Sequence, residues 1–253
     1  MNREMMYWKF AWDTFHLQIF DYGGDVKGIN NWIQERNLGV RNVLEIGCGA
    51  GHYLKFFRGL GYNCTGIDFD RDILEYARQL VLQKETDVEL MEGDILREIP
   101  SKLEGKFDLV LAKHLSFPLN GLEKVLCYVK KALAPGGPRL LVFDFLKKGE
   151  GDLEETVLSI DSAVRNSLFL VRLNQMKLIE ELNEYRWSEV YIVRDAQSGF
   201  TVTRESRRSL WFISRHELEK LLQDNGIGVE VELEESVGID NLSGVTIYGK
   251  LSK

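Results

Sequence analysis

The chain has 253 residues, 44% of them hydrophobic and 28% charged, which is enough to bury a sizeable core. Its formal net charge of −7 disfavours nucleic acid as a partner, because proteins that bind phosphate backbones normally present a basic face. Three scattered cysteines give no zinc-ligand spacing, and no apolar run approaches the ~20 residues needed to cross a bilayer. We therefore expect a reduced, cytoplasmic protein with no metal site and no membrane segment.

The first 37 residues predict two helices. The second covers residues 26–36, and the first carries an aromatic stripe at spacings of three and four. The stripe consists of Met5, Trp8, Trp12, Phe15 and Ile19. Two interpretations stay open for it: packing in the core, or a lid that folds over a bound ligand.

Short strands and helices then alternate over residues 40–146. Strands are predicted at 42–46, 64–67, 88–91, 107–112 and 139–145, and helices at 52–60, 71–83 and 122–133. This alternation indicates parallel strands that are joined by right-handed crossovers and covered on both faces.

The rhythm changes after residue 146. Residues 152–166 predict a helix, whereas residues 167–183 suit either a strand or an extension of that helix. Extended runs at 185–194 and 200–212 flank a turn and predict a hairpin. We expect residues 147–213 to form an inserted antiparallel layer.

A capping box, Ser214 with Glu217, opens a further helix, and strands at 229–233 and 245–251 close the sheet. The predicted fold is α/β: a doubly wound, mainly parallel seven-stranded sheet with an inserted antiparallel β layer and an N-terminal helical lid. The chain is interpreted as one domain, 1–253. Its parts are the N-terminal helices (1–37), the core (40–146 and 214–253) and a cap over the acceptor site (147–213).

The glycines of segment 47–51 follow the first strand and open a helix, which lets backbone approach a ligand. Asp68 ends the second strand 19 residues after Gly49, close to the ~20 expected for a carboxylate that binds ribose hydroxyls. The third glycine of a dinucleotide fingerprint is replaced by His52. Glu45 would repel a pyrophosphate but suits a cofactor that carries an ammonium and a sulfonium. The pattern argues against NAD.

These segments resemble the class I S-adenosylmethionine-dependent methyltransferases. The matching segments are 43–51 (motif I), 66–70 (acidic loop), 92–95 (adenine-side motif), 107–112 and 133–137 (later blocks). The resemblance covers residues 40–145 in order, and residues 214–251 match the expected last helix and closing strands. The N-terminus and the insertion carry no shared motif.

The resemblance implies that S-adenosyl-L-methionine is the cofactor and assigns roles to particular residues. Gly47, Cys48, Gly49 and Gly51 would pass under the methionyl part, with Glu45 near its amino group and Lys113 close by; Asp68 would bind the ribose; Phe69, Asp94 and Ile95 would contact the adenine. For Asp94 taken alone, a turn residue is an equally good interpretation.

The resemblance also implies methyl transfer to an O, N or C atom of a small-molecule acceptor by in-line displacement. His114 is the candidate base or acceptor-orienting residue, and the alternative is a histidine hydrogen-bonded within its loop. Tyr185, Trp187 and Arg208 are candidate acceptor contacts, although the cluster of Arg204, Arg207 and Arg208 also reads as a solvated strand face.

Three other interpretations stay open. A protein or RNA methyltransferase is disfavoured by the acidity and because residues 112–118 lack the Asn/Asp-Pro-Pro-aromatic motif of amino-group methylases. A cofactor-binding protein without catalysis is a second alternative, and an NAD-dependent oxidoreductase comes last. The oligomeric state is left open.

Overall fold

The computed structural model describes residues 1–83, 87–97, 100–115, 121–148, 155–236 and 242–252. Its helices are α1 (Arg3–Ile19), α2 (Tyr22–Glu35), α3 (His52–Gly59), α4 (Arg71–Tyr76), the π-helical turn Ala77–Val81, α5 (Leu122–Ala132) and α6 (Arg215–Asp224), with 3-10 turns at Ser101–Leu103 and Glu180–Leu182. Its strands are β1 (Asn42–Ile46), β2 (Asn63–Asp68), β3 (Glu89–Glu92), β4 (Leu109–Ala112), β5 (Leu140–Lys148), β6 (Thr156–Arg165), β7 (Leu168–Ile179), β8 (Glu184–Asp195), β9 (Thr201–Ile213), β10 (Ile227–Ser236) and β11 (Leu242–Leu251).

The central sheet confirms the predicted α/β class. Its strand order is β3-β2-β1-β4-β5-β11-β10, with β1 to β5 parallel and β11 antiparallel to both of its neighbours, β5 and β10. Because strand side chains alternate between the two faces, neighbouring residues build two separate cores. Val43 packs with α2 and α3, whereas Leu44 packs with α5 and α6. The parallel strands all end at the same edge of the sheet.

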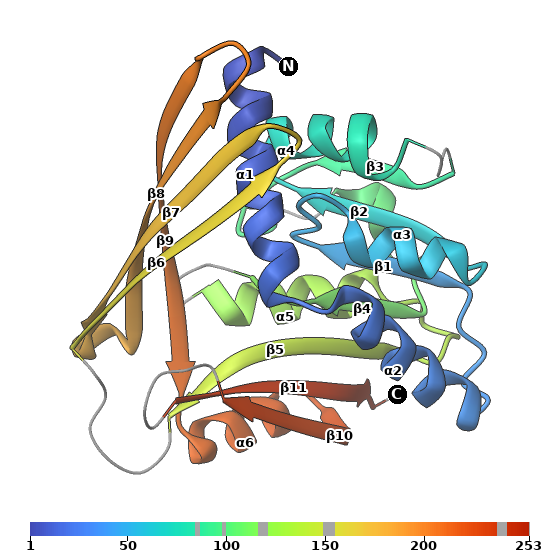
Figure 1. The fold of residues 1–253 in the computed structure, drawn as a ribbon. Coiled ribbons are helices and arrows are strands. Elements are labelled where there is room, and N and C mark those ends of the chain that lie inside the picture. The colour runs from blue at the N-terminus through green and yellow to red at the C-terminus, as the bar shows by residue number, and fades with distance from the viewer. Residues whose placement is uncertain (84–86, 98–99, 116–120, 149–154, 237–241, 253) are drawn as a thin grey trace.

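The insertion is a four-stranded antiparallel sheet, β6-β7-β8-β9. It joins the central sheet only where the end of β9 pairs with the end of β5, at Leu146–Phe212 and Lys147–Ile213. It therefore stands out from the core as a separate wall (Figure 1). The helix predicted over residues 152–166 is wrong: residues 156–165 form β6, and residues 152–154 lie outside the described part. Residues 167–183 form β7 and a short turn.

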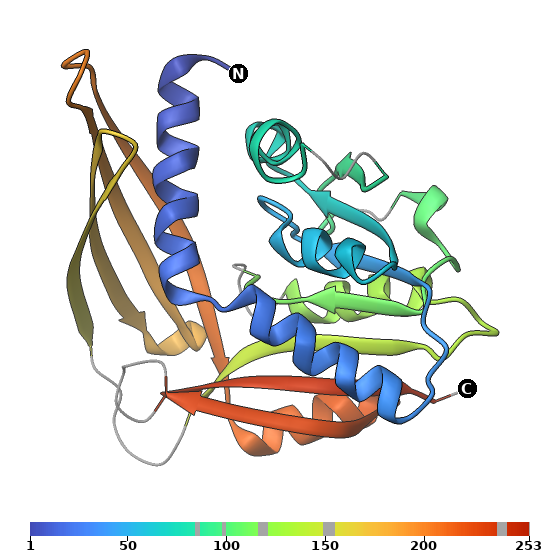
Figure 2. The same cartoon turned by 45° about the vertical axis from the view of Figure 1, so that its right-hand side comes forward.

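Helix α1 lies between this wall and the central domain, as the turned view shows (Figure 2). Ala11 and Phe15 are fully buried and pack against Leu170, Tyr191 and other residues of the wall. Phe10 and Trp12 pack both against this cluster and against the cluster formed by Ala50 and the α4 region. The interpretation of the stripe as core packing is therefore correct for Phe15. It does not hold for Ile19, which is 50% exposed. Within the described residues, no helix is long and apolar enough to cross a membrane.

The capping box predicts a measurable stability effect. The Ser214 side chain accepts the Glu217 N–H, and the Glu217 carboxylate accepts the Ser214 N–H. Ser214→Ala should lower the free energy of unfolding by about 1 kcal/mol in urea titrations, because an orphan N–H of α6 loses its partner. Thr201→Ala at an exposed strand position is the control. Equal effects of the two substitutions would contradict the cap's contribution.

Candidate functional site

A cavity of about 660 Å³ lies between the carboxyl ends of the parallel strands, α1 and the wall. In an open α/β sheet this edge is where ligands bind. Ten of the eleven site residues expected from the sequence line the cavity: Glu45, Gly47, Cys48, Gly49, Asp68, Phe69, Asp94, Ile95, Lys113 and His114. The eleventh, Gly51, is not among the lining residues. It serves as the N-cap of α3 in a left-handed conformation (φ 77°) and contacts Leu82.

The glycine loop is shaped by hydrogen bonds to β2. Asp68 accepts the Gly49 N–H at 2.8 Å and the Asp70 N–H at 2.9 Å, so one carboxylate organises two loops. Gly47 has φ +65°, and a Cβ there would collide with the Leu115 side chain. At Gly49 (φ +49°) a Cβ would lie 3.3 Å from the Trp12 ring. The loop therefore exposes bare backbone to the cavity beneath α1.

Glu45 is the residue whose buried carboxyl best fits a charged group of a cofactor. Its carboxyl is 4% exposed, and its Oε2 atom has no hydrogen-bond partner within the described chain. Burial raises the pKa of Glu45 well above its ordinary value, and the Asp68 charge raises it further. A buried, unpartnered carboxyl is costly unless a cation meets it. The residues present therefore fit the ammonium of S-adenosylmethionine, with exposed loop backbone beside it.

The adenine-side residues are more open. Asp94 accepts the Leu96 N–H at 2.9 Å and lies 3.2 Å from the Arg97 guanidinium. Phe69 is 74% exposed at the edge of the cavity. Asp68, by contrast, is 9% exposed, and burial raises the pKa of its carboxyl although two backbone N–H groups lower it.

Lys113 and His114 belong to one hydrogen-bonded chain. The Lys113 ammonium lies 2.5 Å from the Asp25 carboxylate, which also accepts the Tyr53 hydroxyl at 2.6 Å. The His114 Nε2 atom lies 2.9 Å from the Tyr53 hydroxyl, and its Nδ1 atom lies 2.9 Å from the Asp144 carboxylate. Both imidazole nitrogens are therefore engaged. This geometry matches the interpretation of His114 as a histidine that is hydrogen-bonded within its loop.

Asp144 holds His114 in place. It also accepts the His114 backbone N–H at 2.8 Å, and His114 adopts φ +56° with its ring stacked 3.8 Å from Phe20. Burial raises the pKa of Asp144, but the His114 imidazole and its hydrogen bonds lower it overall to below its ordinary value. An ionised Asp144 thus orients His114 from behind the cavity.

His16 is a lining residue that the sequence interpretation missed. Its Nδ1 atom lies 2.8 Å from the Trp12 carbonyl oxygen, so Nδ1 carries the hydrogen and Nε2 the lone pair. Arg208 Nη1 lies 3.4 Å from that Nε2 atom. Burial lowers the pKa of His16 well below its ordinary value, and the Arg208 charge lowers it further. The sequence signal that could have pointed to His16 is its spacing of four residues from Trp12 and from Phe20.

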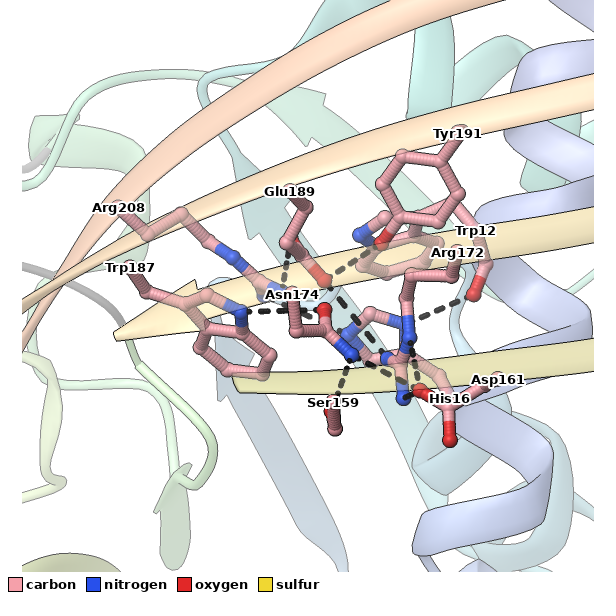
Figure 3. A network of polar contacts seen from close by, with 10 residues as sticks. All are labelled: Trp12, His16, Ser159, Asp161, Arg172, Asn174, Trp187, Glu189, Tyr191 and Arg208. Carbon is pink, nitrogen blue, oxygen red and sulfur yellow. Dashed lines mark hydrogen bonds and ion pairs between the residues drawn. The ribbon is translucent and has the colours of Figure 1, made fainter. Parts of the chain in front are cut away.

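The wall contributes a polar network to this side of the cavity (Figure 3). The Glu189 carboxylate is fully buried, lies 2.6 Å from Arg208, and accepts the Tyr191 hydroxyl at 2.8 Å. Arg172 is 5% exposed and contacts Asp161 at 2.8 Å. The network balances two arginines with two carboxylates, of which Glu189 is fully buried and Asp161 is 35% exposed.

Two of the three expected acceptor contacts reach the cavity. Trp187 and Arg208 both line it, and the Arg208 guanidinium lies 4.1 Å from the Trp187 ring centroid. Tyr185 does not line it, because it is fully buried beside Phe212. The solvated-face interpretation holds for Arg207, whose side chain is 80% exposed, and is wrong for Arg208, whose side chain is 18% exposed.

Comparison with known proteins agrees with this geometry. Residues 43–137 match the methyltransferase domain family. A malonyl-[acyl-carrier protein] O-methyltransferase of Pectobacterium atrosepticum is 29% identical over 51% of this chain and 48% of its own length. A tRNA U34 carboxymethyltransferase of Azotobacter vinelandii is 27% identical over 79% of this chain and 62% of its own length. The chain thus spans about half to three-fifths of the length of these curated relatives.

Solved structures share nearly the whole fold, including the insertion. The sugar N-methyltransferase KedS8 of Streptoalloteichus superposes with a TM-score of 0.73 at 18% identity, over 96% of this chain and 93% of its own. The glycine loop and both acidic strand ends lie within the matched residues. Residues 43–137 thus carry a methyltransferase domain, and the chain shares its fold with solved S-adenosylmethionine-dependent methyltransferases.

Proposed function

We propose that this protein transfers a methyl group from S-adenosylmethionine to a nitrogen or oxygen atom of a small molecule. The observation that carries the proposal is that one cavity has the glycine loop and Glu45 on one side and α1 with the wall on the other. When bound, the cofactor supplies an activated methyl group. The chain must hold the acceptor in line with that group and exclude water.

The cofactor side would use residues already in position. Glu45 would meet the ammonium, Asp68 the ribose hydroxyls, and Asp94 the adenine amino group. Trp12 covers Gly49 from α1 and excludes water from the loop. Gly51 would act indirectly by starting α3 in the correct direction.

A small acceptor fits better than a nucleic acid. A volume of about 660 Å³ falls within the range of about 300–1,000 Å³ that is usual for small-molecule sites. The net charge of −7 would repel a polyanion. The tRNA-modifying relative keeps RNA as the second candidate acceptor class, since it aligns over 79% of this chain.

Three imidazoles line the cavity, those of His16, His52 and His114. His52 and His114 lie 2.6 Å and 2.9 Å from a carboxylate, whereas His16 Nε2 meets only the Arg208 guanidinium, at 3.4 Å. A methyl acceptor with an N–H or O–H group must point its lone pair toward the methyl group. Its hydrogen then points away from the methyl group and needs a partner. His16 Nε2 would accept that hydrogen. A carbon acceptor would make no use of it, so nitrogen and oxygen acceptors are favoured.

The activity itself can be tested directly. We expect purified protein to release S-adenosylhomocysteine with members of a panel of amines, amino sugars, phenols and hydroxy acids, and not with unmodified tRNA. Turnover on tRNA alone would replace the proposal with the RNA alternative. Tight cofactor binding without turnover on any class would indicate a non-catalytic binder.

Glu45 predicts a pH-dependent affinity for the cofactor. Because the pKa of the free carboxyl is raised, binding of the ammonium must release a proton from Glu45. S-adenosylhomocysteine should therefore bind more tightly as the pH rises above the ordinary carboxyl range, measured by calorimetry. Glu45→Gln should weaken binding about tenfold and flatten the pH dependence. Glu104→Gln, at an exposed position, should keep the wild-type profile. A Glu45→Gln profile as steep as wild type would contradict this assignment.

Substitution of either His16 or His114 should lower turnover. His16→Phe keeps a ring beside Trp12 but removes the lone pair, so kcat on the identified acceptor should fall about 100-fold with cofactor affinity unchanged. His16→Gln, which restores an acceptor atom, should recover part of the loss. His114→Ala should also lower kcat with little effect on cofactor affinity, because it disrupts the Asp144–Tyr53 chain. Unchanged turnover in His16→Phe would exclude a chemical role for His16.

A further inference from the structure

The outer face of the wall exposes large apolar side chains in one group. On β6, Leu158 is 70%, Ile160 74% and Val164 65% exposed, and on the neighbouring β7, Phe169 is 51% and Leu173 37% exposed. Single exposed apolar residues are normal, but a contiguous group of this kind marks a surface that another protein covers.

Strand β6 is also an open edge. It has ten residues and pairs with β7 alone among the strands of the described chain. Proteins usually protect a long edge with charges or proline, because its free N–H and C=O groups can pair with another strand. β6 carries two charges: Asp161 turns inward to Arg172, and Arg165 is the last residue of the strand. No charge lies on the outward face of β6 from Thr156 to Val164.

The sequence of β6 is complementary to itself when the strand is reversed. In an antiparallel pair with Ile160 opposite its own copy, Leu158 meets Ser162 and the apolar faces coincide. Glu155, exposed just before the strand, then lies opposite Arg165, exposed at its end. A twofold axis creates this ion pair twice, once at each end.

Neighbouring registers lack this match. Shifting the centre by one residue, to Asp161, places two like charges opposite each other. A register that pairs odd positions with even ones would turn the apolar residues of the two strands to opposite faces. In the register centred on Ile160, a second copy of the same strand provides both the reversed charges and the matching apolar row.

We propose that two copies of this protein associate through their β6 edges about a twofold axis at Ile160, which joins the two walls into one eight-stranded antiparallel sheet. Such an interface is isologous and closed, so it yields dimers rather than filaments. The occupant of the exposed edge is therefore a second copy, and a different protein partner is an outcome that the test can reveal.

The mass in solution tests the association. The full chain at about 50 µM should elute with a light-scattering mass of about 58 kDa, twice the 29.1 kDa of one chain. Ile160→Lys should give 29.1 kDa with an unchanged melting temperature. Thr203→Lys, at an exposed position on the far strand β9, should remain dimeric. A wild-type mass of 29.1 kDa, or a dimer that survives Ile160→Lys, would overturn the proposal.

Charge reversal tests the register. Glu155→Arg and Arg165→Glu should each raise the dimer dissociation constant about threefold to tenfold, because like charges then face each other twice. The double variant should return to the wild-type value. Additive weakening in the double variant would contradict the proposed pairing, and an interface elsewhere on the molecule would leave all three variants unchanged.

Cross-linking tests the position of the axis. In a Cys127→Ser background, which removes the exposed natural thiol, Ile160→Cys should form an intermolecular disulfide on mild oxidation because the two copies of this position face each other. Val164→Cys should not, because its partner is Thr156 of the other copy. Equal cross-linking at both positions would overturn the register.

Discussion

The site depends on the fixed position of α1, and buried polar side chains fix it. Lys9, Asp13 and His16 are 4%, 6% and 5% exposed, and each finds its partner on a different element. Lys9 pairs with Asp70 in the loop after β2. Asp13 lies 2.6 Å from His52 at the start of α3 and accepts the Tyr76 hydroxyl at 2.9 Å. Because an unpaired buried charge is costly, sliding α1 by one turn would break all these contacts together.

This constraint connects the two halves of the cavity. The partners of Lys9 and Asp13 belong to the cofactor side, whereas His16 meets Arg208 of the wall. A helix anchored in this way sets the distance between the glycine loop and the acceptor side. It also explains His52 at the position where a dinucleotide fingerprint has its third glycine. That residue supports α1, a contact that a glycine could not make.

The parts of the fold that the sequence predicted are those governed by local chemistry. A strand that ends in glycines, a cap such as Asp70 and the box at Ser214 act within a few residues, so their elements were predicted nearly to their ends. Strand β6 was missed because its apolar residues, such as Ile160, face solvent, and its pairing with β7 depends on residues further along the chain. The solvent-facing apolar residues that made β6 hard to predict from the sequence are also the basis of the proposed dimer.

The site residues also differ in whether local sequence is enough to predict them. Glu45 and Asp68 sit at strand ends, where topology alone brings them together, and both could be predicted. His16 could not, because a search for an apolar stripe ignores a histidine, and the pKa of His16 is lowered by burial and by the charge of Arg208, which is distant in the sequence.

The inner face of the wall is likewise divided into an apolar part and a polar part. Near one end Leu170 packs on Phe15, and along the same strand Arg172 and Asn174 join the polar network. The wall thus anchors α1 through its apolar half and faces the cavity with its polar half. Its outer edge is free to bind a second copy without disturbing either contact.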